Sequence, residues 1–169
     1  MDTRRIDHTF NCDPTTYWTT FFSPEYNHAL FVERLKFERW EVVERVETED
    51  GFRRVIEAVP RVGDLPGPIK ALLKNGAGYQ EQGRYYRSEG RYTTHIRSKS
   101  LGDRLGFDGV MTVEDLGSGR CRRVYVFEVD AKVPFVGGML EKRLLDDVEK
   151  SYGKAARFTE QYLARQSGA

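Results

Sequence analysis

The feature that most constrains the fold is a junction between a strand and a long helix near the carboxyl end. Residues 124–152 read VYVFEVDAKVPFVGGMLEKRLLDDVEKSY, and Pro134 ends the alternating strand because proline has no N–H for pairing. Gly137 and Gly138 then allow a close turn of the backbone. From about residue 135 to 165, apolar residues recur every three or four positions and predict one amphipathic helix: Leu140, Leu144, Val148, Tyr152, Ala155, Phe158 and Tyr162.

The residues before this junction predict seven strands in all. Strand 1 is expected over 4–12, and two short helices over 14–33, where Asp13 and Ser23 are suitable N-caps before prolines. Alternating segments between turn sequences such as EDG and GSG predict strands 2–7 within residues 35–133. A short helix is expected near 66–75.

One helix cannot cover a flat sheet of seven strands, so a strongly curved antiparallel sheet around the terminal helix is the economical arrangement. The chain has 169 residues, a usual size for one domain, so a single α+β domain over residues 1–169 is predicted. From Tyr125 onward, alternate residues of the last strand are expected to face inward: Tyr125, Phe127, Val129, Ala131 and Val133.

Charge and composition exclude several kinds of partner. Lysine plus arginine (27) nearly balances aspartate plus glutamate (26), so no global charge favours nucleic acid. No apolar run approaches the roughly 20 residues that span a bilayer, and no signal-like segment opens the chain, so a cytoplasmic protein without stable membrane insertion is expected. Cys12 and Cys121 lack CxxC spacing and are expected to be packing residues, with no metal and no cofactor.

The order of elements resembles the START-like superfamily, also called SRPBCC, helix-grip or birch-pollen-allergen-like. Three stretches, HTFNCDPTTYW, LPGPIKALL and VPFVGGMLEK, resemble a bacterial START-like family of uncharacterised function. Members of the superfamily hold sterols, phospholipids, polyketides or plant hormones between the sheet and the terminal helix, and some are polyketide cyclases or aromatases. The resemblance therefore implies a helix-grip fold with a cavity for a hydrophobic small molecule, such as a lipid or a polyketide-like compound.

The residues themselves also favour a cavity. A curved sheet larger than its helix can fill leaves space, and Gly83, Gly109 and Ala131 are expected to remove side-chain volume on its inner face. The alternative is a solid core in which the aromatic residues pack against the helix. Gly137 and Gly138 are the expected hinge for gating the cavity. Nine residues are predicted to line the ligand: Tyr85, Tyr92, Phe107, Met111, Tyr125, Phe127, Leu140, Leu144 and Val148.

No catalytic constellation is evident. His8, His28 and His95 share no motif spacing; His95 is expected on the outer face and His8 is expected to be buried and neutral. A basic cluster is expected either on a solvated strand face or against an acidic head group: Arg84, Arg87, Arg91, Arg97, Lys99 and Arg104.

Three functions remain open on the sequence. The favoured one is a non-catalytic carrier or sensor of a hydrophobic molecule. The second is a polyketide cyclase or aromatase-like enzyme that uses tyrosine or arginine groups of the pocket. The third is a protein-interaction module in which the cavity is vestigial.

Overall fold

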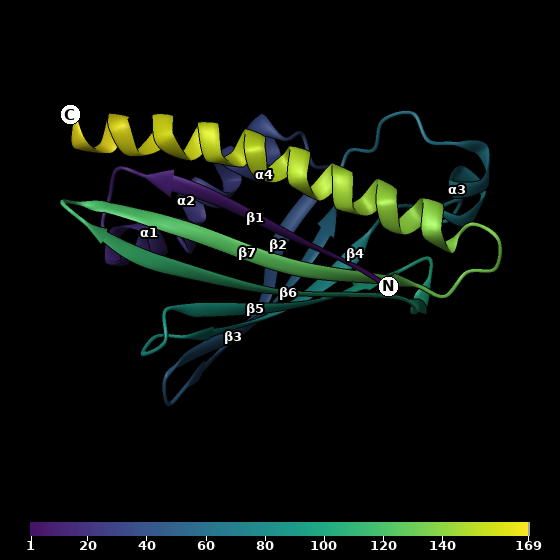
Figure 1. Ribbon diagram of the computed structural model, residues 1–169, viewed down its shortest axis with the longest axis horizontal. Coiled ribbons are helices and arrows are strands. Elements are labelled where there is room, and N and C mark those ends of the chain that lie inside the picture. The colour runs from purple at the N-terminus through teal and green to yellow at the C-terminus, as the bar shows by residue number, and fades with distance from the viewer. Residues whose placement is uncertain (169) are drawn as a thin grey trace.

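The computed structural model describes residues 1–168 and contains one seven-stranded antiparallel sheet in the order β1-β7-β6-β5-β4-β3-β2 (Figure 1). This arrangement confirms the predicted helix-grip fold. The strands are β1 (Asp2–Phe10), β2 (Arg39–Thr48), β3 (Gly51–Val59), β4 (Tyr79–Tyr86), β5 (Arg91–Ser98), β6 (Gly102–Gly117) and β7 (Arg120–Ala131).

Short helices follow β1 and interrupt the sheet after β3. They are α1 (Pro14–Phe21), α2 (Pro24–Asn27), its π-helical continuation η1 (His28–Arg34) and α3 (Gly67–Leu72). The Asp13 carboxylate accepts a hydrogen bond from the Thr16 N–H at 2.7 Å, and the Ser23 hydroxyl accepts one from the Tyr26 N–H at 3.4 Å. Both predicted N-caps are therefore present, since each side chain satisfies a free N–H of the first helical turn.

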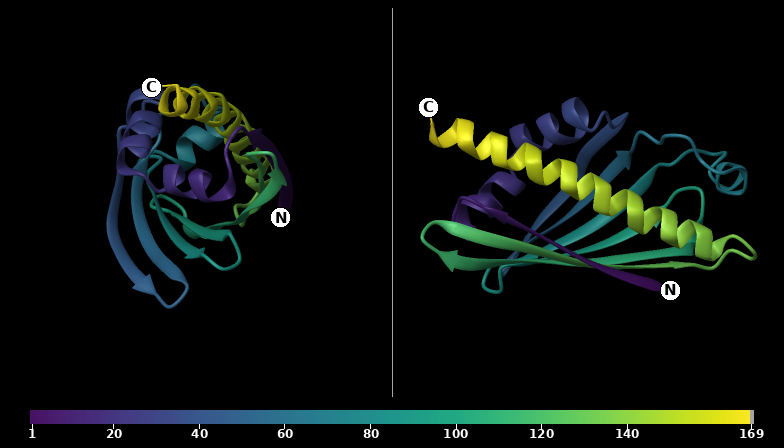
Figure 2. Two further views of the ribbon diagram at one scale, coloured as in Figure 1. Left: turned by 90° about the vertical axis from the view of Figure 1, so that its left-hand side faces the viewer. Right: turned by 45° about the horizontal axis from the view of Figure 1, so that its top comes forward.

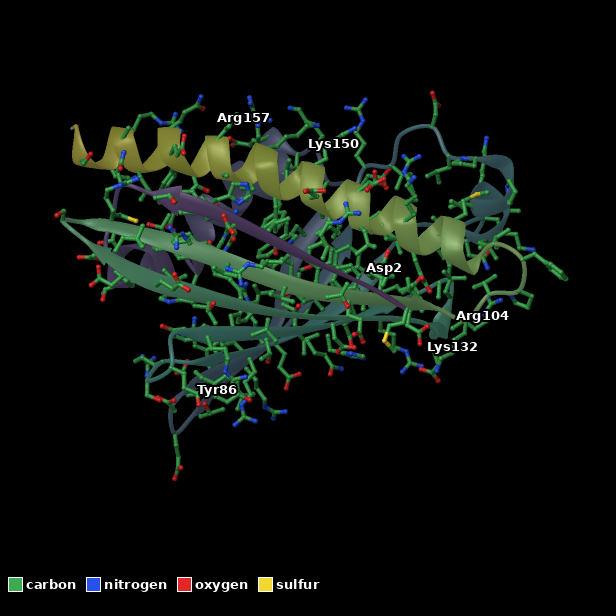
Figure 3. The ribbon with its side chains drawn as sticks, viewed as in Figure 1. Asp2, Tyr86, Arg104, Lys132, Lys150 and Arg157 are labelled. Atoms are coloured by element: carbon green, nitrogen blue, oxygen red, sulfur yellow. The ribbon has the colours of Figure 1, made fainter. Side chains whose placement is uncertain are left out.

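The long helix α4 (Gly137–Ser167) lies along the inner face of the sheet. Figure 2 shows the sheet curling beneath it, with α1 near the end of the sheet under the last turns of α4 and α3 beside the opposite end, near the first turns. Arg4 of β1 pairs with Asp146 at 2.8 Å and with Glu149 at 2.7 Å, which joins α4 to the edge strand. Lys150 and Arg157 point away from the sheet (Figure 3).

The inner face near α1 is packed solid with aromatic rings. The Tyr85 ring lies 5.0 Å from the Trp18 ring and 4.9 Å from the Phe22 ring, centroid to centroid. Tyr17, also from α1, is 1 % exposed and stacks on Phe10 of β1 at 5.3 Å. At this end of the sheet, the solid core weighed in the sequence analysis is the correct description.

Two inward glycines serve a purpose other than the one predicted. A Cβ atom on Gly83 would fall on the Tyr92 ring, and a Cβ on Gly109 would fall on the Tyr125 ring. The volume that these glycines remove is therefore already occupied by the two tyrosine rings, which cross the sheet diagonally. The expectation that Gly83 and Gly109 leave open space is wrong, because neighbouring rings use that space.

Within residues 1–168, no helix combines the length and the apolar character that crossing a bilayer requires. Likewise, no group of three or more histidine, cysteine, aspartate or glutamate side chains in these residues is placed to hold a metal ion.

Candidate functional site

At the α3 end, inward-facing side chains keep accessible surface although they lie deep in the fold. Tyr79 and Ile96 face inward on β4 and β5, yet both are only part-buried. Burial raises the pKa of the Tyr79 phenol. Inward-facing side chains with accessible surface show that this end of the inner face is less tightly covered than the end near α1. The same partial burial occurs on the covering elements, at Leu65, Leu72, Leu73, Leu144 and Val148.

The side chains around this less covered end are mainly apolar. The rings of Phe107 and Phe127 stack at 5.7 Å on the sheet side, and both are at most 5 % exposed. Leu140, from the first turn of α4, is 2 % exposed and belongs to the same hydrophobic cluster. The buried apolar side chains at this end therefore come from β6, β7 and the first turn of α4.

A polar cluster of Arg54, Tyr92 and Glu81 borders the same region. The Tyr92 hydroxyl donates to Glu81 Oε1 at 2.9 Å and accepts from Arg54 Nε at 2.9 Å. Arg54 is 5 % exposed and faces inward on β3, between Phe52 and Ile56 in the strand alternation. The cluster places a cation, a phenol and a carboxyl group in a row beside apolar walls.

Two members of this cluster have polar atoms that no described residue satisfies. The terminal nitrogens of Arg54 and Oε2 of Glu81 have no hydrogen-bond partner within residues 1–168, and none of these atoms is fully sealed from solvent. Since buried polar groups are normally hydrogen-bonded, these atoms remain available to hydrogen-bond a bound molecule.

Burial raises the pKa of the Glu81 carboxyl, although the Arg54 charge and the Tyr92 hydrogen bond act in the opposite direction. A carboxyl with a raised pKa changes its protonation state at a pH closer to neutrality than an exposed glutamate does. The cluster can therefore donate or accept a proton at Glu81, and it can donate hydrogen bonds from Arg54.

This raised pKa predicts a pH-dependent effect of Glu81→Gln. Well below about pH 4.3, the side chain is protonated in the folded and unfolded chain, so burial of its charge costs nothing. As pH rises, the unfolded chain ionises first, and the wild type loses stability until pH passes the higher folded-state pKa. The variant should gain stability relative to the wild type across this window, by about 1.4 kcal/mol for each unit of pKa elevation. Urea unfolding of both proteins over a pH series measures it; a difference that does not change with pH would contradict the prediction.

A second buried arginine belongs to a structural network instead. Arg123 is 2 % exposed and donates from Nη1 to the Tyr17 hydroxyl at 3.1 Å, while its Nη2 lies 3.0 Å from His8 Nδ1. Burial, followed by the Arg123 charge, lowers the pKa of His8, which favours the neutral ring. His8 is part-buried rather than buried. The sequence predicted that the inward-facing residues of β7 start at Tyr125. Because Arg123 is buried, they start at least two residues earlier.

The outer face of the sheet carries the remaining predicted groups. His95 is exposed, and its Nδ1 lies 2.8 Å from Asp108 on the neighbouring strand. The predicted basic cluster also lies on this face and in the loops that join its strands. Several of its members have acidic partners: Arg91 pairs with Glu89, Arg97 with Asp103, and Lys99 with Glu57. The structure thus separates these residues from the inner site.

The nine predicted lining residues all belong to, or pack against, one hydrophobic cluster. They occupy different parts of it, since Tyr85 lies in the aromatic packing of α1 whereas Leu144 and Val148 are part-buried on the first half of α4. Sequence reasoning missed Arg54, Tyr79, Glu81 and Ile96. The inward assignment of Gly83 and Tyr85 on β4 also implies inward positions for Tyr79 and Glu81, because alternate strand residues share a face.

The two predicted hinge glycines differ in their surroundings. Gly137 is buried, and a Cβ there would collide with the backbone carbonyl oxygen of Ala131. Gly138 is exposed and has open space where a Cβ would project. Gly137 therefore permits close packing of α4 on the end of β7, while Gly138 tolerates a side chain.

The curved antiparallel sheet, the long carboxyl-terminal helix and the short helices after β1 define the helix-grip fold, which a solved START superfamily protein shares. Residues 5–163 match the family described as "Protein of unknown function (DUF2505)", and the chain belongs to this family. These findings confirm the predicted resemblance to a START-like family of uncharacterised function. No curated protein matches the chain.

Several solved structures share the fold at low sequence identity. The Zhui aromatase/cyclase from Streptomyces sp. R1128 has 11 % identity and a TM-score of 0.71, with 99 % of each chain covered. A START superfamily protein from Mycobacterium smegmatis has 14 % identity and a TM-score of 0.62, covering 95 % of this chain and 98 % of that one. Norcoclaurine synthase from Thalictrum flavum, solved with dopamine and hydroxybenzaldehyde, has 15 % identity and a TM-score of 0.60, covering 95 % and 88 %.

Proposed function

We propose that this protein binds a hydrophobic small molecule, such as a lipid or a polyketide-like compound, as a non-catalytic carrier or sensor. The bound molecule occupies the space between the α3 end of the sheet and the first half of α4. The observation that carries this proposal is the accessible surface of deep, inward-facing side chains, including Ile96, Leu144 and Val148. Mainly apolar walls with a few polar groups are typical of small-molecule sites.

The apolar walls can supply enough free energy for useful affinity. If a ligand buries about 300 Å² of apolar surface, transfer from water contributes roughly 7 kcal/mol before the costs of association. The proteins of similar fold lend support at the level of architecture, since one was solved with dopamine and hydroxybenzaldehyde and another is an aromatase/cyclase.

A cavity-filling substitution tests this proposal. Val148→Trp should occupy the space beside α4 and abolish the saturable fluorescence increase of the apolar probe N-phenyl-1-naphthylamine, because the added ring takes the ligand's volume. Val110→Trp is the matched control, since Val110 is 40 % exposed on the outer face of the sheet. Equal probe binding by wild type, Val148→Trp and Val110→Trp, with all three folded, would refute an internal site.

We also propose that the loop between β7 and α4 opens to admit the ligand. Phe135 is fully exposed and has a φ of 68°, a left-handed conformation that is strained for a bulky residue. On the helix side, the Glu141 carboxylate accepts the Ala131 N–H at 2.9 Å and holds the first turn in place. A strained loop next to a fixed first turn of α4 can change conformation while the helix stays in place, as a loop that opens and closes an entrance does.

Gly138→Ala tests this gate. The alanine should slow exchange of N-phenyl-1-naphthylamine several-fold without loss of stability, because it restricts backbone freedom at a position with room for a Cβ. Gly137→Ala is unsuitable, since its collision with Ala131 would disturb the fold itself. Stopped-flow displacement gives the rates, and an exchange rate equal to that of the wild type in folded Gly138→Ala would contradict a hinge at this position.

A second candidate function is acid–base catalysis on the bound molecule, which the position of Glu81 favours. A carboxyl with a raised pKa beside Tyr92 and Arg54 is a suitable proton donor or acceptor. A comparison of the small molecules released from wild type and Glu81→Gln separates the two functions. A carrier should release the same compound from both proteins, whereas an enzyme should retain unconverted substrate in the variant.

A further inference from the structure

Arg54 carries a buried charge that the described residues do not neutralise by direct pairing. Its side chain is buried, and it forms no ion pair with a carboxylate in residues 1–168. A buried charge is costly unless it is paired and hydrogen-bonded. The indirect link to Glu81 through the Tyr92 hydroxyl satisfies only Nε of the guanidinium.

Aromatic rings hold the guanidinium in position. Its Cζ atom lies 5.0 Å from the centroid of the Phe22 ring, 5.2 Å from that of Tyr92, 5.7 Å from that of Phe21 and 5.8 Å from that of Trp40. Contacts of this kind stabilise a cation but accept none of the in-plane N–H bonds of the fork. The aromatic shell therefore fixes the guanidinium and leaves its terminal N–H groups for another acceptor.

The cross-strand register places this fork beside the proposed ligand space. Arg54 lies opposite Gly83, and the next inward row of the sheet contains Ile56, Glu81 and Ile96. Of these three residues, Glu81 and Ile96 keep accessible surface. The polar end of the space is thus formed by Arg54 and Glu81, and its apolar wall begins directly beyond them.

We propose that Arg54 anchors the ligand, and that the ligand is an apolar molecule ending in a carboxylate or a carbonyl group. The acceptor oxygen lies against the terminal nitrogens of Arg54, and the apolar body extends past Ile96 toward α4. This inference rests on the proposed function and adds to it the class of ligand. A guanidinium fork matches a carboxylate with two parallel hydrogen bonds, and it binds a carbonyl with one or two.

Three naphthalene probes of similar size test the anchor. They are 2-naphthoic acid, methyl 2-naphthyl ketone and 2-ethylnaphthalene, which differ in the end group alone. Binding of each to the purified full chain is measured by calorimetry for wild type, Arg54→Met and Arg53→Met. Arg53 is the matched control because it is the neighbouring residue on β3 and is exposed on the opposite face.

Wild type should bind at least one oxygenated probe about tenfold or more tightly than the hydrocarbon, since a charge-assisted hydrogen bond contributes on that scale. Arg54→Met should remove this preference and leave the affinity for 2-ethylnaphthalene unchanged, while Arg53→Met should behave as wild type. A preference for the acid alone identifies a carboxylate ligand, and a preference shared by the ketone identifies carbonyl recognition.

Equal affinity of wild type for all three probes would overturn the anchor but leave the hydrophobic site intact. Failure of all three to bind would refute the proposed function together with the anchor. If Arg54→Met does not fold, Arg54→Lys replaces it, because lysine keeps the charge and loses the fork. In Arg54→Lys, the preference over 2-ethylnaphthalene should fall more for the acid than for the ketone. If folded Arg54→Lys keeps the full preference of the wild type, the anchor is also overturned.

Discussion

Leu145→Ala is expected to lower the free energy of unfolding by about 2–5 kcal/mol, the range for truncating a fully buried leucine. Leu145 is 0 % exposed and lies in the main hydrophobic cluster, where α4 seals the inner face of the sheet. The loss combines the missing transfer free energy with the cavity that the rigid surroundings leave behind. Urea unfolding monitored by circular dichroism and tryptophan fluorescence measures the change.

Met139→Ala is the control on the same helix, because Met139 is 48 % exposed. Its effect should stay within about 0.5 kcal/mol, as for most surface substitutions. Equal losses for Leu145→Ala and Met139→Ala would show that α4 does not pack on the sheet as described.

Gly109→Ala is expected to cost about 1–3 kcal/mol through overpacking. The new Cβ would fall on the Tyr125 ring, which is 2 % exposed and stacks on Phe127 at 5.1 Å, so the ring has little freedom to move aside. The displacement would also strain the hydrogen bond between the hydroxyls of Tyr125 and Thr94, now 3.1 Å long. The midpoint of thermal or urea unfolding measures the loss.

Gly106→Ala is the matched control, three residues earlier on β6. Its Cβ would make only ordinary contacts, at 3.8 Å from Asp130 atoms, so the substitution should be neutral or slightly stabilising because it restricts the unfolded chain. A folded Gly109→Ala variant as stable as Gly106→Ala would mean that the Tyr125 ring does not occupy the space over Gly109.

The fold could be predicted because its signals are local. Pro134 and the glycine pair mark the end of β7, and the apolar spacing that follows predicts a helix over nearly the range of α4. The buried stripe was less predictable. The expected stripe included Leu144 and Val148 but omitted Leu145, because a helix inside a curved sheet is buried over more than one row of side chains.

The candidate site depended on contacts that alternation does not reveal. Arg54 falls in the inward phase of β3, yet an arginine there gives no sequence signal of burial; the aromatic shell that holds it comes from α1, β2 and β5. The sequence could not predict that the Tyr92 ring fills the volume over Gly83, because this depends on the rotamer of Tyr92 on the next strand. Periodicity gives the face of a residue but not the direction of a neighbouring ring.

Native mass spectrometry of the freshly purified protein, followed by denaturation and identification of released molecules, tests the central claim most directly. The expected result is a stoichiometric hydrophobic adduct of a few hundred daltons that Val148→Trp lacks and Val110→Trp retains. A bare protein mass for wild type, together with no saturable uptake of N-phenyl-1-naphthylamine, would contradict a ligand site between the sheet and α4.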